Sequence, residues 1–262
     1  MLNKEHKIKY GLKIWSINNN DLFKEAAELF KRKEIDFVEL YIVPDSLSSG
    51  KSEVLNYLRD IPTTIHAPHE DHDFDIFKLD DSKVEFFKKQ IIGTADLLNS
   101  KFIVVHAAGG DSQEIFKEKV DKIKDKRILI ENMPKIGLND EICFGYSYNQ
   151  LKFIKNCGFD LCLDLAHAVK SALSQKIDYK KFIEKIIADF ELIYFHISNG
   201  SLNNMKDEHK NLFDGELDIK WIKKTLVGLM AKKDVYLVFE VPKGPNGLEN
   251  DVKNMRYFRS IL

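Results

Sequence analysis

Residues 101–133, KFIVVHAAGGDSQEIFKEKVDKIKDKRILIENM, contain the pattern that decides the fold. A run rich in β-branched residues at 101–108 is followed by a helical pattern at 111–125 and by a second such run at 127–133. The first run is apolar on both faces, as expected for a strand of a parallel sheet that helices cover on each side. This stretch therefore predicts a strand–helix–strand unit with parallel strands.

The same alternation extends over the whole chain of 262 residues. Strands are predicted at 8–15, 36–43, 62–67, 101–108, 127–133, 159–166, 192–198 and 235–241. Helices are predicted at 20–34, 51–59, 82–99, 111–125, 147–156, 178–189, 218–233 and 248–260. Eight such units close naturally into a (β/α)8 barrel of about 250 residues, so we expect an α/β protein with one TIM-barrel domain over residues 1–262.

An open doubly wound sheet is the alternative fold. Its usual signature is a GxGxxG turn after the first strand, whereas this turn reads WSINNND. The irregular segments at 68–81, 134–146 and 199–217 all follow predicted strands, on the side where a barrel carries its site. The barrel is therefore the favoured prediction.

The composition limits the class of protein. With 44% hydrophobic and 31% charged residues the chain is typical of a globular protein, and a formal charge of −1 gives no general attraction to nucleic acid. No apolar run approaches the roughly 20 residues that span a bilayer, and the N-terminus lacks the pattern of a secretion signal. Cys143, Cys157 and Cys162 have no metal-type spacing, which indicates reduced thiols. We expect a cytoplasmic protein without a membrane partner.

Ionisable residues gather at the ends of the predicted strands, which converge on one mouth in a barrel. One such residue alone could simply hydrogen-bond a loop, but several carboxylates in one pocket repel one another unless cations neutralise them. Imidazole and carboxylate groups suit zinc or manganese. The sequence therefore predicts divalent metal ions, zinc first, with manganese and magnesium as alternatives. The candidate ligands are His66, His106, Glu131, Asp164, His167, His196, Asp207, His209 and Glu240.

In these residues the chain resembles the xylose isomerase-like barrels and, within them, the endonuclease IV family, which cuts DNA at abasic sites with three zinc ions. The resemblance covers most of the chain. It implies three ion sites, formed by His66, His106 and Glu131; by Glu131, Asp164, His196 and Glu240; and by His167, Asp207 and His209. It also implies phosphoester hydrolysis, because such a cluster binds a phosphate and activates a water molecule. Glu131 and Glu240 are the candidate catalytic residues.

A sugar or sugar-phosphate isomerase or epimerase is the alternative function, because such enzymes of the same superfamily need only the middle set. Glu131 and Glu240 would then act as acid and base. A non-catalytic barrel with a structural metal is the third hypothesis, although a structural site needs only about four ligands.

The substrate is constrained by the loops around the mouth. The loop after the third strand, HAPHEDHDFDIFKLDD at 66–81, is acidic where a DNA-binding enzyme should be neutral or basic, and VPDSLSSGK at 43–51 is not basic either. We therefore expect a phosphorylated or sugar-like substrate, with abasic DNA as a less favoured partner. The candidate substrate-binding residues are His69, Asn132 and Lys243.

Overall fold

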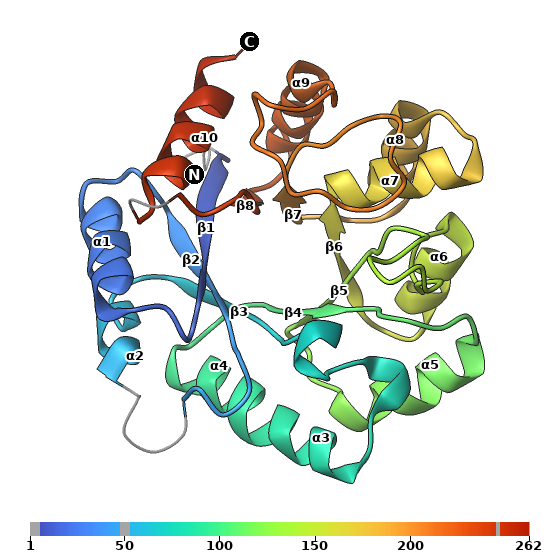
Figure 1. The fold of residues 1–262 in the computed structure, drawn as a ribbon, viewed down its shortest axis with the longest axis horizontal. Helices are drawn as coiled ribbons and strands as arrows, with labels where there is room; N and C mark the ends of the chain where they lie inside the picture. The colour runs from blue at the N-terminus through green and yellow to red at the C-terminus, as the bar shows by residue number, and fades with distance from the viewer. Residues whose placement is uncertain (1–5, 48–52, 245–246, 262) are drawn as a thin grey trace.

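Eight parallel strands form a closed barrel in which each strand pairs with the next and the last pairs with the first, and the helices surround this ring (Figure 1). The computed structural model describes residues 6–47, 53–244 and 247–261. The predicted (β/α)8 barrel is thus confirmed. The strands are β1 Ile8–Trp15, β2 Phe37–Tyr41, β3 Thr63–His66, β4 Ile103–His106, β5 Ile128–Glu131, β6 Asp160–Asp164, β7 Tyr194–Ile197 and β8 Val235–Phe239.

Helices link successive strands, and most begin at a side chain that accepts a hydrogen bond from the first turn, such as Asn19, Ser147 and Asp178. A π-helical segment, Phe87–Ile92, joins α3 to α4. Within the described residues no helix is long and apolar enough to cross a membrane. The helices are α1 Asn20–Lys31, α2 Glu53–Leu58, α3 Asp81–Phe86, α4 Gly93–Leu97, α5 Gln113–Val120, α6 Tyr148–Asn156, α7 Leu165–Gln175, α8 Tyr179–Asp189, α9 Ile219–Met230 and α10 Glu249–Ser260.

Helix α7 is the main departure from the predicted elements. The strand predicted at 159–166 ends at Asp164, and α7 follows at once, where no helix was predicted. Asp164 ends the strand because its carboxylate accepts a hydrogen bond from the His167 N–H at 2.6 Å and so caps the new helix. His167 therefore lies in the first turn of a helix and not at a strand end. Residues 51–52 of the predicted helix 51–59 and residues 48–51 of the loop 43–51 lie outside the described residues.

Two layers of side chains inside the barrel support the mouth, and they come from the same strands because side chains two residues apart on a strand share a face. The lower layer is mostly apolar and consists of Phe37, Val104, Leu129, Cys162, Tyr194 and Val238, with Gly11 and Thr64 from the two remaining strands. Gly11 leaves room for the Phe37 ring, with which a Cβ atom at this position would collide. The upper layer lies two residues further along each strand and consists of Lys13, Glu39, His66, His106, Glu131, Asp164, His196 and Glu240.

Candidate metal centre

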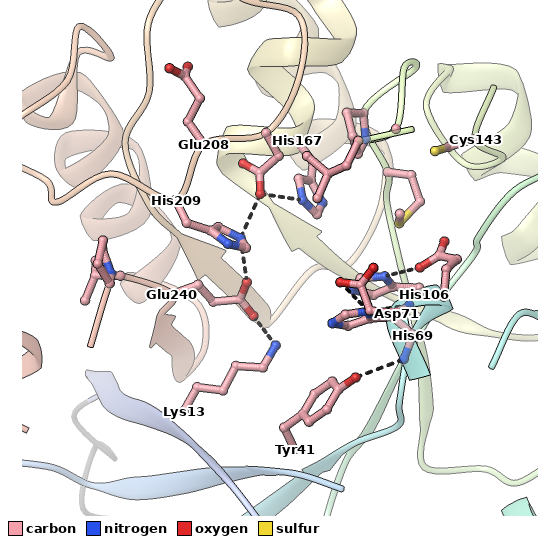
Figure 2. A pocket seen from close by; sticks show the side chains of 18 of the residues that line it. Lys13, Tyr41, His69, Asp71, His106, Cys143, His167, Glu208, His209 and Glu240 are labelled. Atoms are coloured by element: carbon pink, nitrogen blue, oxygen red, sulfur yellow. Dashed lines mark hydrogen bonds and ion pairs between the residues drawn. The ribbon is translucent and has the colours of Figure 1, made fainter. Parts of the chain in front are cut away.

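Lys13, His106 and Glu240 of the upper layer line a cavity of about 490 Å³ at the barrel mouth (Figure 2). All nine predicted ligands meet at this end of the barrel, and five of them line the cavity. They form three sets, and in each set one potential ligand atom per residue lies within 4.8 Å of the others. Glu131 belongs to the first two sets, which therefore adjoin. The sets are His66, His106 and Glu131; Glu131, Asp164, His196 and Glu240; and His167, Asp207 and His209.

The third set depends on α7 and on the loop 199–217 between β7 and α9. His167 Nε2 lies 3.6 Å from an Asp207 carboxylate oxygen, and His209 Nε2 lies 2.8 Å from the same oxygen. The carboxylate of the intervening Glu208 accepts a hydrogen bond from the buried ammonium group of Lys170, on α7, at 2.5 Å. The same helix therefore carries one member of the set and anchors the loop that carries the other two.

The third set is continuous with the second. His209 Nε2 lies 3.2 Å from Glu240, which also accepts a hydrogen bond from Lys13 at 2.5 Å. Figure 2 shows this chain of contacts from His209 through Glu240 to Lys13. The three sets thus form one polar cluster rather than three isolated ones.

In two of the histidine rings one nitrogen, the outer one, bonds to a backbone carbonyl, and the other, the inner one, faces the carboxylates of the cluster. His66 Nδ1 donates a hydrogen bond to the Ala67 carbonyl at 2.7 Å, and its Nε2 faces Glu131 at 3.3 Å. His167 Nδ1 likewise donates to the Asn132 carbonyl at 2.9 Å, which leaves Nε2 toward Asp207. Metal-binding histidines usually show this arrangement, in which an outer acceptor fixes the tautomer.

The charges of the cluster compensate one another. Burial alone would raise the pKa of the Glu131 carboxyl, but His196 and His106 hold it well below its usual value. Burial alone would lower the pKa of His167, but Asp164 and Asp207 raise it to about 10. In this structure imidazolium groups and Lys13 therefore supply the positive charge that the carboxylates require.

The donor set fits divalent cations. Asp164 Oδ2 and Asp207 Oδ1 are buried and have no hydrogen-bond partner among the described residues. A buried carboxylate oxygen without a donor is costly, and a cation removes that cost. The mixture of imidazole and carboxylate groups is the one that zinc and manganese accept. Binding of ions by the nine residues stays a prediction.

The predicted substrate-binding residues lie in different environments. His69 and Lys243 line the cavity. Burial and the neighbouring His106 lower the pKa of His69 to about 2, so its ring is neutral. Lys243 pairs with Asp251. Asn132 is buried beneath the cavity, and its amide group bonds to the backbone N–H and carbonyl of Asp164 at 2.7 and 3.0 Å.

Two members of the upper layer, Lys13 and Glu39, were not predicted from the sequence. Glu39 is fully buried and contacts His196 and Tyr194, while Lys13 contacts Glu240 and Glu39. The spacing along the strands could have indicated them. Lys13 lies two residues after Gly11, Glu39 lies two residues after Phe37, and the register of β1 with β2 pairs Lys13 with Glu39. Both residues lie inside their strands, whereas the predicted ligands of the upper layer lie at strand ends.

Comparison with known proteins places these observations in a family. A family model described as xylose isomerase-like TIM barrel matches residues 23–261. A protein named probable endonuclease 4 from Mycoplasmopsis synoviae (strain 53) is 26% identical over 272 residues, covering 91% of this chain and 89% of the relative. A protein of the same name from Halothermothrix orenii is 25% identical over 204 residues, covering 68% of this chain and 70% of the relative.

Solved structures share the fold. The 3-keto-D-glucoside 4-epimerase from E. coli superposes with a TM-score of 0.67 at 13% identity, covering 97% of this chain and 99% of that one. AP endonuclease, family 2, from Brucella melitensis has a TM-score of 0.61 at 16% identity, with 92% and 97% covered. At these identities the structures show likeness of fold alone. The match of the family model over most of the sequence confirms the predicted resemblance, and the chain belongs to the family of xylose isomerase-like TIM barrels.

Proposed function

We propose that this protein is a metal-dependent phosphoester hydrolase whose mouth binds three divalent ions, zinc first. The observation that carries the proposal is the third set, His167, Asp207 and His209, beside the other two. An isomerase of the family would need only the second set. The curated relatives named probable endonuclease 4 support the same interpretation. Bound ions would supply positive charge to an ester phosphate and lower the pKa of a water molecule.

The side chains of the mouth have separate tasks in this proposal. Glu131 holds two neighbouring sets together, because its carboxylate belongs to both. Glu240 is held by Lys13 at 2.5 Å and by His209 at 3.2 Å, so its position links the second and third sets. Lys13 also lines the cavity, where its ammonium group can meet an anionic oxygen of the substrate. The neutral His69 ring forms part of the wall and can exchange hydrogen bonds with an uncharged group.

A small phosphorylated substrate fits the mouth better than duplex DNA. The cavity of about 490 Å³ is the size of a small-molecule site. Its wall includes Glu70, Asp71 and Glu141, whose negative charges repel the sugar–phosphate backbone of DNA. Beside the mouth, Lys206 donates a hydrogen bond to the Leu138 carbonyl at 2.9 Å and so ties the loop after β7 to the loop after β5.

A sugar isomerase or epimerase is the second candidate function, favoured by the second set. Glu131 and Glu240 approach the same atom, His196 Nδ1, at 3.2 and 2.9 Å, so two carboxylates of the upper layer flank this nitrogen. Such a pair can remove a proton from one face of a sugar carbon and return one. The likeness to 3-keto-D-glucoside 4-epimerase is compatible with this candidate.

The two candidates differ in their need for the third set. We would measure ions per chain by mass spectrometry, hydrolysis of phosphomonoesters, phosphodiesters and an abasic duplex, and proton exchange on a ketose panel. The test variant is His167→Ala. The hydrolase proposal predicts three ions in the unmodified protein, two in the variant, and loss of hydrolysis. Two or fewer ions in the unmodified protein, with proton exchange that survives the substitution, would replace it with the isomerase.

A further inference from the structure

Glu39 is a buried carboxylate that no part of the proposed reaction uses. It lies on β2 with no exposed surface, directly above Phe37 and the rest of the mostly apolar lower layer. A buried charge in such a place is costly unless it is paired and hydrogen-bonded. An apolar side chain of similar size would avoid that cost, so the partners of Glu39 should explain its presence.

The partners of Glu39 hold one of its oxygens in place. Oε2 accepts a hydrogen bond from the Tyr194 hydroxyl at 2.8 Å and faces His196 Nε2 at 3.0 Å. The other oxygen, Oε1, has no hydrogen-bond partner among the described residues and faces the Lys13 ammonium group at 3.6 Å. Glu39 is thus anchored from below by Tyr194 and balanced by Lys13, with one interaction directed at an imidazole.

The ring of His196 is oriented in the opposite sense to those of His66 and His167. Those two rings turn Nδ1 outward to a backbone carbonyl and Nε2 inward. His196 turns Nδ1 inward, 2.9 Å from Glu240 and 3.2 Å from Glu131, and Nε2 outward to Glu39. Within the part of the chain that the structure describes, no backbone carbonyl bonds this outer nitrogen, so the carboxylate takes the place that carbonyls take elsewhere.

We propose that Glu39 is a positioning residue of the metal centre, which accepts the Nε2 proton of His196 and thereby presents Nδ1 to the ion shared with Glu131, Asp164 and Glu240. The inference rests on the proposed function only in that it requires an ion in the second set. A neutral imidazole has two tautomers, and only the one with a free Nδ1 can bind there. A carboxylate acceptor selects that tautomer and makes the ring a stronger ligand than an amide carbonyl would.

Glu39 could instead be a ligand itself, because Glu39, His66, His196 and Glu240 also lie within 4.8 Å of one another. The contacts argue against this role. One oxygen is engaged by Tyr194 and His196, and the other faces Lys13, whose ammonium group lies between Glu39 and Glu240 at 3.6 and 2.5 Å. The position that a further cation would take is thus held by a lysine of the chain.

The test measures zinc affinity by competition with a chelator in Glu39→Gln and Glu39→Leu. Loss of an outer partner of a ligand histidine typically weakens metal binding by about 10- to 100-fold. We expect about 10-fold for Gln, which still accepts a hydrogen bond but carries no charge, and about 100-fold for Leu, for one ion only. Asp75→Asn is the matched control, since Asp75 is a buried carboxylate outside the three sets.

A second readout does not depend on any variant. Long-range proton–nitrogen NMR correlations of the zinc-loaded protein report which nitrogen of His196 carries the proton, and we expect Nε2. A proton on Nδ1, unchanged affinity in both Glu39 variants, or equal weakening in Asp75→Asn would overturn the inference while leaving three ions and hydrolysis intact. Failure of the unmodified protein to bind zinc would instead overturn the proposed function first and this inference with it.

Discussion

The two layers inside the barrel come from the same strands but differ in polarity. In the lower layer Phe37, Leu129 and Tyr194 are closely packed and apolar, and in the upper layer, two residues further along the same strands, Glu39, Glu131 and His196 are charged or polar. Because both layers lie on the same face of each strand, the strand geometry that packs the lower side chains also places the upper side chains at the mouth. Because the lower layer excludes water from beneath, the charges above it interact strongly and need specific partners.

The largest effect is expected from Glu131→Gln in the upper layer. A neutral amide at this position could not serve two adjoining sets as an anionic bridge, so both should lose their ions while the third set keeps its own. We expect zinc affinity of these two sets to fall by more than ~100-fold, the upper end for losing only an outer partner, and activity to fall with it. Metal analysis after dialysis checks this. Retention of three ions would show that Glu131 is not shared.

Leu129→Ala, two residues lower on the same strand, should reduce the stability of the fold without reducing the zinc content. It leaves a cavity in the lower layer, and such truncations cost about 2–5 kcal/mol of the free energy of unfolding. The ligands above keep their positions, so we expect full zinc content. Urea unfolding of the metal-free protein and metal analysis of the folded protein provide the two measurements. A loss of ions comparable to that in Glu131→Gln would mean that the layers are not separable.

The two layers were not equally predictable from the sequence. Strand positions and six of the eight upper-layer residues followed from apolar runs that end in His, Asp or Glu. Lys13 and Glu39 lie inside their runs, and only the register of β1 with β2 shows that they belong with the others. Helix α7 was missed because LDLAHAV continues the apolar pattern of β6, and the turn depends on the cap that Asp164 provides. Likewise, the orientation of each imidazole depends on partners remote in sequence, such as Glu39 for His196.

The pH dependence of zinc affinity should also reflect the upper layer and its neighbour His167. With its pKa raised to about 10, His167 is protonated at neutral pH in the metal-free protein and must lose that proton to bind an ion. Each such proton makes zinc affinity rise about 10-fold per pH unit, or about 1.4 kcal/mol, up to about pH 10. Calorimetry in buffers of different ionisation enthalpy measures the protons released. Affinity that is independent of pH between 7 and 9 would contradict this expectation.

The metal-free protein should respond to pH in the opposite direction. A raised folded-state pKa stabilises the fold fully below the unfolded value of about 6.5, and this contribution is lost as pH rises through about 10. The melting temperature without metal should therefore fall from pH 7 to pH 10. Cys162 of the lower layer should add to this fall, because burial raises the pKa of its thiol and only the unfolded chain, with a thiol pKa of about 8.5, ionises in this range.

The smallest effect is expected where the layers meet, at Thr64. Its hydroxyl forms a 2.7 Å hydrogen bond with the Tyr194 hydroxyl, which in turn donates to Glu39. Thr64→Val keeps the shape of the side chain and removes one hydrogen bond, so it should cost about 1 kcal/mol of stability. Tyr194 can still donate to Glu39, and zinc affinity should therefore stay within about twofold of the unmodified protein, as for a change that removes no partner of a ligand histidine.

Thr63→Val is the control for this variant, since Thr63 loses a similar bond, 2.9 Å to the Ile61 carbonyl, and is not part of the lower layer. Equal stability losses and unchanged zinc affinity in both variants would show that Thr64 contributes only to stability, and that the partners which affect metal binding end at the Tyr194 hydroxyl. If Thr64→Val alone weakened zinc binding by about 10-fold or more, the loss typical of a removed outer partner, Thr64 would act on the metal centre through Tyr194 and Glu39. Metal binding in the upper layer would then depend on the hydrogen bonds that run from Thr64 through Tyr194 to Glu39, and the two layers would be coupled through these three side chains.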